Sequence, residues 1–233
     1  MFLLDIGNTH TRIAQSDGAA IRILRTLPTA MLTAADLPAG ERIAAASVVP
    51  RAAARLSPLG ITFIDAGNCG NLIDFDRVDA STLGADRVAN VVAAAEFYEL
   101  PALVIDCGSA ITCELVDEKR RFLGGAIAPG RMLQRAVLHS GTAQLPETEL
   151  DSAIPDRPGR NTAEAIKLGV DAGAVGMVRE LAFRMGLAAH LRTVVLAGGD
   201  AGFFAAHFPE WRVAEPDFTL QGVRLAAEAI TRP

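Results

Sequence analysis

Short apolar runs that end at turn residues predict four buried strands. They cover residues 2–4, 43–49, 103–105 and 193–197, and each run is too short for a helix. Alanine-rich stretches with helical periodicity lie between and after them, at 87–100, 130–139, 162–187 and 220–230. Because strands alternate with helices, the pattern predicts an α/β fold with mixed sheets flanked by helices.

Two segments share one pattern of a strand, Asp-x-Gly, a small polar residue and a second strand. The first begins at Asp5 in LLDIGNT and continues to Thr11, and the second begins at Asp106 in VIDCGSA and continues to Thr112. This internal repeat divides the chain into two halves that open with the same device. Two such copies facing each other would form a cleft.

The repeated segment suits phosphate chemistry. Glycine tolerates the positive φ of a tight turn, so backbone N–H groups become available to phosphate oxygens. Hydroxyls of Thr9, Thr11, Ser109 and Thr112 add donors. A carboxylate at the strand end can hold a hydrated magnesium ion. The alternative is that both aspartates only cap hairpin turns, and the presence of two copies favours function.

A third segment, TVVLAGGDA at 193–201, ends a strand at paired glycines. Bare backbone at the carboxyl end of a strand can lie against a nucleotide base or ribose. Many α/β proteins end a strand in this way, so this pattern alone is weak.

Charge and composition exclude several classes of protein. The chain has 233 residues, a net charge of −5 and a pI near 5.4, so the basic footprint of a nucleic-acid-binding protein is missing. Only Lys119 and Lys167 are lysines, and neither follows a glycine-rich phosphate loop.

The cysteines and the apolar runs predict a cytoplasmic location. Three cysteines without a CxxC pair indicate neither a disulfide framework nor a zinc site. The opening segment MFLLDIGNT turns polar too soon for a signal peptide, and no run approaches the ~20 apolar residues needed to span a bilayer. We therefore expect no membrane partner.

Eight motifs in order resemble the type III pantothenate kinase family along essentially the whole chain. They are DIGNT (5–9), ASVVP (46–50), GADR (84–87), DCGSAIT (106–112), GGAIAPG (124–130), GTAQLP (141–146), GRNTAEAIKLG (159–169) and AGGDA (197–201). The resemblance implies the actin-like ATPase fold of two ribonuclease H-like lobes, which we expect at 1–100 and 101–233. It implies ATP-dependent phosphorylation of pantothenate in coenzyme A synthesis, with Mg²⁺, a monovalent cation (K⁺ or NH₄⁺) and a homodimer.

The resemblance also assigns roles to individual residues. It implies that Asp86 is the catalytic base and that Asp106 binds the monovalent cation. Predicted substrate contacts are Gly84, Ala85, Asp86, Arg87 and Thr162. Predicted ATP contacts are Asp5, Ile6, Gly7, Asn8, Thr9, His10, Thr11, Arg12 and Ser109.

Physical reasoning agrees with these roles without assigning them alone. A carboxylate at Asp86 can orient an alcohol and accept its proton, and Arg87 can bind a carboxylate through its planar fork. The alternative is a surface ion pair between Asp86 and Arg87 that opens a helix. His10 can touch a phosphate, but a solvent-facing turn residue is the simpler interpretation.

Three positions depart from the family pattern. Ser109 stands where threonine is usual, and Glu114 stands where aspartate is usual, which adds a methylene to a carboxylate expected near the phosphates. The segment between Phe75 and Gly84 is long, so Phe75 is only a candidate for the aromatic substrate contact.

Two other functions stay open at this point. One is a kinase of another small alcohol, or a nucleotide hydrolase, on the same fold. The other is a regulatory homologue that has lost or altered catalysis, an interpretation that Glu114 keeps open.

Overall fold

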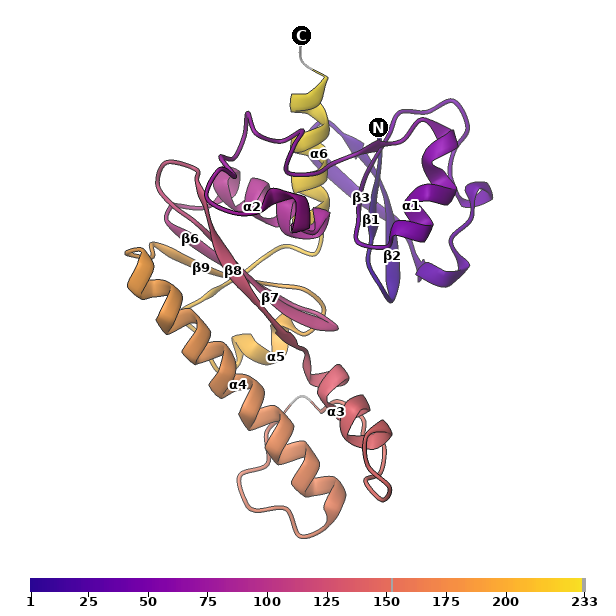
Figure 1. Ribbon diagram of the computed structural model, residues 1–233. Helices are drawn as coiled ribbons and strands as arrows, with labels where there is room; N and C mark the ends of the chain where they lie inside the picture. The colour runs from indigo at the N-terminus through magenta and orange to yellow at the C-terminus, as the bar shows by residue number, and fades with distance from the viewer. Residues whose placement is uncertain (152, 232–233) are drawn as a thin grey trace. The chain divides into compact units, whose positions relative to one another are not determined.

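The computed structural model describes residues 1–151 and 153–231, which form two sheets and the helices around them (Figure 1). Short 3₁₀ turns cover Thr29–Met31, Ala34–Asp36, Ser57–Leu59 and Ala80–Thr82. In this part of the chain no helix is both long and apolar enough to cross a membrane.

The first sheet has the strand order β3-β2-β1-β4-β5. Its strands are β1 (Phe2–Ile6), β2 (His10–Asp17), β3 (Ala20–Pro28), β4 (Ile43–Ser47) and β5 (Thr62–Phe63). β1 pairs antiparallel with β2 and parallel with β4, so the sheet is mixed as predicted. The antiparallel register places Arg12 opposite Asp5, and opposite residues point to the same face of a sheet.

One side of this sheet is an aliphatic core. It includes Leu4 and Ile6 of β1, Ile13 of β2 and Leu56 of helix α1 (Pro50–Leu56), all of them at most 3% exposed. Alternate residues of β1 and β2 therefore point into the core, which fixes the register of the hairpin between them.

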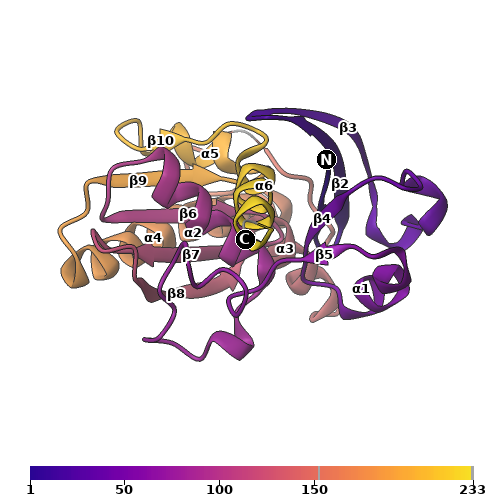
Figure 2. The same ribbon diagram turned by 90° about the horizontal axis from the view of Figure 1, so that it is seen from above.

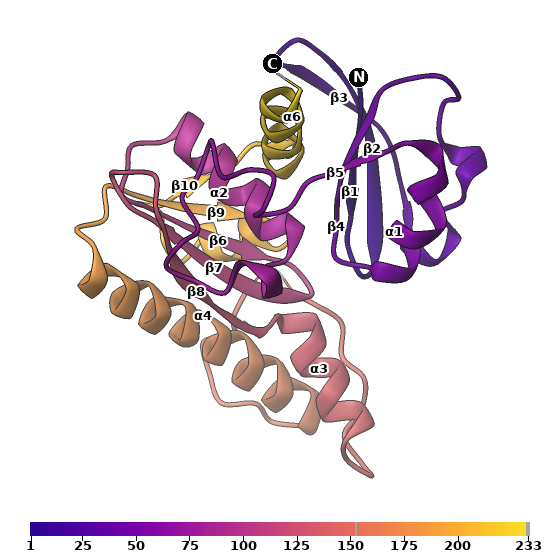
Figure 3. The same cartoon turned by 45° about the horizontal axis from the view of Figure 1, so that its top comes forward.

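Helices α2 (Ala85–Phe97) and α6 (Phe218–Ile230) pack against each other with very little space between them (Figure 3). A Cβ atom on Gly222 would lie 1.9 Å from the backbone oxygen of Ala89. Beside this contact the hydroxyl of Thr219 donates to the buried Asn90 side chain at 2.9 Å. Gly222 therefore lets the backbones of the two helices approach closely. This packing fixes α2, whose first turn carries the GADR motif.

The second sheet has the strand order β10-β9-β6-β7-β8, and Figure 2 shows its strands side by side. Its strands are β6 (Ala102–Cys107), β7 (Ala110–Val116), β8 (Phe122–Pro129), β9 (Thr193–Ala197) and β10 (Arg212–Val213). Residues 102–105 of β6 are completely buried, as expected for a central strand.

Three further helices accompany this sheet: α3 (Arg131–Ser140), α4 (Thr162–Ala188) and α5 (Ala201–Ala205). α4 is 27 residues long and runs beside the sheet, where Ala174 and Val178 are fully buried (Figure 1). α3 packs against α4.

Spatial contacts group the chain into two compact units. The first is Met1–Ala102 with Glu114–Gly124 and Glu215–Pro233, and the second is Leu103–Cys113 with Gly125–Ala214. Helix α6 therefore belongs to the first unit. The division into lobes at 1–100 and 101–233 stays a prediction.

All four predicted strands and all four predicted helices form. The largest difference in bounds is at the first predicted helix: 87–100 was predicted, and α2 ends three residues earlier, at Phe97. The repeated pattern also predicted the second strand of each hairpin, β2 and β7, but β3, β5, β8 and β10 were not predicted. β3 and β8 each have a single buried residue, and β5 and β10 are only two residues long, so no apolar run marks them.

Candidate active site

Both Asp-x-Gly segments form the predicted hairpins, one in each sheet. In the first, which joins β1 to β2, the N–H of Gly7 donates to the carbonyl of His10 at 3.1 Å. In the second, which joins β6 to β7, the N–H of Gly108 donates to the carbonyl of Ala110 at 3.0 Å. The first loop is therefore one residue longer than the second.

The predicted reason for the glycines is wrong. The φ angles of Gly7 and Gly108 are outside the left-handed region, so neither turn depends on a positive φ. At Gly7 the constraint is space, because a Cβ atom would lie 3.1 Å from the carbonyl oxygen of His10. A side chain at this position would require the backbone at His10 to shift by a few tenths of an ångström.

Two threonines support the first loop from the core. The hydroxyl of Thr29 donates to the carbonyl of Gly7 at 2.7 Å, and its N–H donates to the carbonyl of Thr9 at 2.9 Å. Thr11 is fully buried, and its hydroxyl lies 2.9 Å from that of Thr29. Thr11 thus shapes the loop from inside, whereas the tip formed by Asn8, Thr9 and His10 is exposed. Ile6 is a core residue.

Arg12 neutralises the carboxylate of the first hairpin. Its Nε and a terminal nitrogen lie 3.1 and 3.0 Å from Oδ2 of Asp5, and the other terminal nitrogen donates to the carbonyl of Pro216 at 2.8 Å. The resemblance placed Arg12 among the ATP contacts but did not indicate this ion pair. The cross-strand register was the only signal that could have found it.

The GADR motif forms the first turn of α2. Gly84 is the N-cap residue, Ala85 is buried, and the carboxylate of the half-buried Asp86 accepts the N–H of Arg87 at 2.7 Å. A Cβ atom on Gly84 would lie 2.6 Å from Oδ1 of Asp86. Only glycine therefore lets this carboxylate fold back over the start of the helix.

The side chain of Arg87 pairs with a carboxylate that is distant in the sequence. Its Nε donates to Oε1 of Glu114 at 2.9 Å, and Glu114 is fully buried. The Arg87 guanidinium also lies 5.8 Å from the centre of the Phe122 ring. Glu114 therefore orients the guanidinium of Arg87.

Phe75 is a core residue, so its proposed role as a substrate contact is not supported. It is 6% exposed, and its ring centre lies 5.8 Å from that of Phe122. No other aromatic residue lies between Phe75 and Gly84.

Two glycines let neighbouring segments close onto the second hairpin. Gly198 has a φ of +86°, and a Cβ atom there would lie 2.4 Å from Oδ1 of Asp106. A Cβ atom on Gly130 would lie 2.1 Å from the carbonyl oxygen of Gly108. Gly198 thus supports the hairpin. Gly199 has open space where its Cβ would be, so it provides the bare backbone predicted at the end of β9. Ser109 is exposed at the tip.

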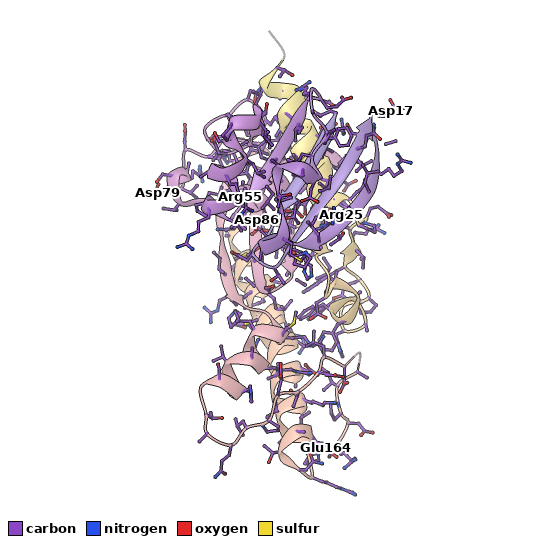
Figure 4. The ribbon with its side chains drawn as sticks, turned by 90° about the vertical axis from the view of Figure 1, so that its right-hand side faces the viewer. Asp17, Arg25, Arg55, Asp79, Asp86 and Glu164 are labelled. Carbon is purple, nitrogen blue, oxygen red and sulfur yellow. The ribbon has the colours of Figure 1, made fainter. Side chains whose placement is uncertain are left out.

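Thr162 is the first residue of α4, and the motif around it is a helix cap. The Asn161 side chain accepts the N–H of Glu164 at 2.9 Å. The carboxylate of Glu164, which is labelled in Figure 4, accepts the N–H of Arg160 at 2.9 Å. That backbone hydrogen bond is the main cause of the lowered pKa of the Glu164 carboxyl. Asn161 thus satisfies an unpaired N–H of the first helical turn, and Glu164 holds the residue before the cap, which explains the Asn-x-x-Glu spacing.

The exposed Thr162 opens onto an apolar groove between α3 and α4. The groove has a volume of about 620 Å³ and is lined by Pro129, Gln134, Val137, Leu138, Leu145, Thr162, Ala165, Ile166, Gly169 and Val170. Its walls carry few polar groups that could hold a charged ligand.

Among the described residues, no group of three or more His, Cys, Asp or Glu side chains could hold a metal ion. Asp5, Asp106 and the loop hydroxyls are hard oxygen donors, which suit Mg²⁺ and K⁺ rather than softer metals. Mg²⁺ usually takes only one or two carboxylates and completes its shell with phosphates and water. The residues present therefore fit a metal that arrives with ATP.

Sequence reasoning missed a group of charged residues behind the second hairpin. Arg131, Arg135 and Asp171 are buried and form ion pairs. The spacing of the two arginines, four residues apart on α3, was a visible signal. Their acidic partner lies 36 residues beyond Arg135 and could not be found from spacing.

Comparisons with known proteins identify the family. The family described as type III pantothenate kinase matches residues 1–184. The type III pantothenate kinase of Endomicrobium trichonymphae is 34% identical over 72% of this chain and 64% of its own length. That of Akkermansia muciniphila is 34% identical over 97% of both chains.

Solved structures show the fold. A conserved putative Baf family transcriptional activator from Campylobacter jejuni superposes with a TM-score of 0.68 at 19% identity over 98% of both chains. A putative 2-dehydro-3-deoxygalactonokinase from Sinorhizobium meliloti superposes with a TM-score of 0.61 at 16% identity over 100% of this chain and 97% of that one. The predicted actin-like, sugar-kinase type of fold is confirmed, and the chain belongs to the type III pantothenate kinase family.

Proposed function

We propose that this chain phosphorylates pantothenate with ATP and yields 4′-phosphopantothenate, the first step of coenzyme A synthesis. The observation that carries the proposal is that both Asp-x-Gly segments form hairpins in a chain of this family. Kinases of the family use ATP with a divalent metal. The soluble substrates suit a cytoplasmic enzyme without nucleic-acid or membrane partners.

Asp86 is the proposed general base. Its carboxylate lies at the start of a rigidly packed helix, and its half-buried position reduces competition from water. There it orients the pantothenate hydroxyl and accepts its proton as the phosphoryl group is transferred. Arg87, oriented by Glu114, binds the pantothenate carboxylate.

The two hairpins are the proposed phosphate-binding elements. The exposed tip of the first offers backbone N–H groups and the hydroxyl of Thr9, and the second offers Ser109. Arg12 adds a positive charge in a hairpin that has no lysine. Mg²⁺ bound to ATP would neutralise part of the phosphate charge, and Asp5 would hold its water shell.

An assay of ATP consumption against several acceptors tests this function. We expect ADP to form rapidly with pantothenate and only slowly with hexoses or with no acceptor. Mass spectrometry of the product should show one added phosphoryl group. Faster turnover with a sugar would indicate another small-alcohol kinase, turnover without acceptor would indicate a hydrolase, and ATP binding without turnover would indicate a regulatory homologue.

We also propose a homodimer in which Thr162 and Asp86 approach a shared substrate site from different subunits. Three exposed glycines on α4, Gly169, Gly173 and Gly176, have open space where a Cβ atom would be. Glycine inside a helix lowers its stability by about 1 kcal/mol relative to alanine, so three glycines on one face are better explained by close packing than by exposure to solvent. Val137 on α3 is 57% exposed beside this face, and a second copy of the chain would cover both.

Light scattering across a dilution series tests the assembly. We expect twice the monomer mass of 24.5 kDa at concentrations where the enzyme is active, with an interface above about 1,200 Å² in total. Val137→Glu, which places a charge on the groove, should shift the equilibrium toward monomer and lower activity. Full activity of a monomer would contradict the shared site.

A further inference from the structure

A group of four charged side chains lies behind the second hairpin. Arg131 is the centre: its Nε donates to Oδ1 of Asp171 at 2.9 Å, and one terminal nitrogen lies 2.8 and 3.1 Å from the two carboxylate oxygens of Asp200. Arg135 donates to both oxygens of Asp171 at 2.7 and 2.8 Å. Arg131 is 2% exposed and Asp171 is fully buried.

Such a group is costly to keep for stability alone. Removing charges from water costs several kcal/mol per ion, and well-packed apolar residues often replace buried ion pairs without loss of stability. Burial also raises the pKa of the Asp200 carboxyl even though Arg131 lies beside it. A role in positioning the neighbouring hairpin explains these buried ion pairs better than a role in stability alone.

Asp200 holds the hairpin by its own backbone, and Arg131 follows a residue that does the same. The N–H of Asp200 itself donates to the carbonyl of Cys107 at 2.9 Å, on one side of the loop. The N–H of Gly130, the residue before Arg131, donates to the carbonyl of Ser109 at 2.9 Å, on the other side. The ion pair between Arg131 and Asp200 therefore joins the two segments that form backbone hydrogen bonds to residues 107–109.

The segments that contain Gly130 and Gly198 pack closely against the hairpin. Neither glycine has room for a methyl group, so a small shift of either segment would deform the loop. Arg131 is itself fixed on two further sides. Its guanidinium carbon lies 3.3 Å from the centre of the Phe203 ring, and a terminal nitrogen donates to the carbonyl of Asp151 at 2.6 Å.

We propose that Arg131 is a positioning residue for the second phosphate hairpin, holding residues 106–109 in the shape that binds ATP, and that Asp171 orients Arg131. Arg131 also neutralises Asp200, whose carboxylate would otherwise add a negative charge beside the loop that receives the phosphates. The inference rests on the proposed binding of ATP at this hairpin.

Arg131→Lys is the primary variant, because it keeps the charge and removes the fork that joins Asp171 to Asp200. We expect the KM for ATP to rise at least about tenfold, by analogy with the loss seen when a residue that orients metal ligands is replaced. The KM for pantothenate should change little. Asp171→Asn should act in the same direction, and Arg224→Lys is the matched control, because Arg224 is also buried and pairs with Glu228 at 2.9 and 3.1 Å.

Hydrogen exchange of the apo protein gives a second readout that needs no turnover. In Arg131→Lys the amide of Gly108 should exchange faster, while the amide of Gly7 in the first hairpin should be unaffected and serves as the internal control. If Arg131→Lys does not fold, Asp200→Asn provides the same comparison, since it keeps the backbone bond to Cys107.

The outcomes separate the inference from the proposed function. A higher KM for ATP with faster exchange at Gly108 supports the inference. A lower melting temperature with unchanged KM for ATP and unchanged exchange would overturn it, because the network would then only stabilise the fold. A wild-type protein that does not phosphorylate pantothenate would refute the proposed function, and calorimetric titration with a non-hydrolysable ATP analogue would still decide the inference.

Discussion

Asp86→Asn is expected to lower kcat at least ~100-fold, because a positioned general base contributes about 10²–10⁴ to the rate. The amide oxygen of asparagine can still accept the N–H of Arg87, which Asp86 accepts at 2.7 Å. The first turn of α2 should therefore keep its shape. Steady-state kinetics with pantothenate, and calorimetry with an ATP analogue, should show lost turnover with intact nucleotide binding.

Asp79→Asn is the matched control for this experiment (Figure 4). Asp79 is an exposed cap residue that accepts the N–H of Ser81 at 3.1 Å, so the substitution is chemically the same. Exposed substitutions of this kind usually change stability by no more than about 0.5 kcal/mol, and kcat should be unchanged. Turnover of Asp86→Asn equal to that of Asp79→Asn would remove Asp86 from the mechanism.

The sequence predicted the hairpins because their information is local. An apolar strand, a turn residue and a second strand follow one another within about a dozen residues at Asp5 and again at Asp106. The strand-to-turn pattern needs no knowledge of distant residues. The same is true of α2, whose helical period begins just after the GADR motif.

The reason for the glycines was not local and was predicted wrongly. A positive φ can be argued from turn chemistry alone, but the constraint at Gly7 is a close approach to the carbonyl of His10. Gly130 and Gly198 are required by a hairpin that lies elsewhere in the sequence. Such constraints depend on which segments meet, and a single sequence does not give that.

The partners of the charged residues could not be predicted for the same reason. Arg87 was considered with its neighbour Asp86, yet it pairs with Glu114, 27 residues away. Arg131 pairs with Asp171 and Asp200, 40 and 69 residues away. Sequence spacing indicates ion pairs only between neighbouring residues, whereas the fold brings together charged residues that are distant in the sequence.

Each hairpin has an arginine that neutralises a nearby carboxylate. Arg12 pairs with Asp5 of the first hairpin, and Arg131 pairs with Asp200 beside the second. In a chain with only two lysines, arginine thus supplies positive charge beside both of the proposed phosphate-binding hairpins.

Replacing K⁺ by a large organic cation is expected to lower activity at least about tenfold. ATP brings about four negative charges toward a hairpin that carries the Asp106 carboxylate and has no lysine. Two like charges about 4 Å apart repel by about 4 kcal/mol at an effective dielectric constant of about 20, which is more than a factor of ten in affinity. A bound K⁺ or NH₄⁺ would relieve this repulsion, and a tetraalkylammonium ion is too large to take its place.

Kinetics at constant ionic strength in potassium, ammonium, sodium and tetramethylammonium salts provide the measurement. Asp106→Asn should lower activity in K⁺ and abolish the difference between K⁺ and tetramethylammonium, because the carboxylate that requires the cation is gone. Asp79→Asn should retain the full difference. Full activity of the wild-type protein in tetramethylammonium alone would show that Asp106 does not bind a monovalent cation, and a cation effect that persists in Asp106→Asn would assign the cation to another site.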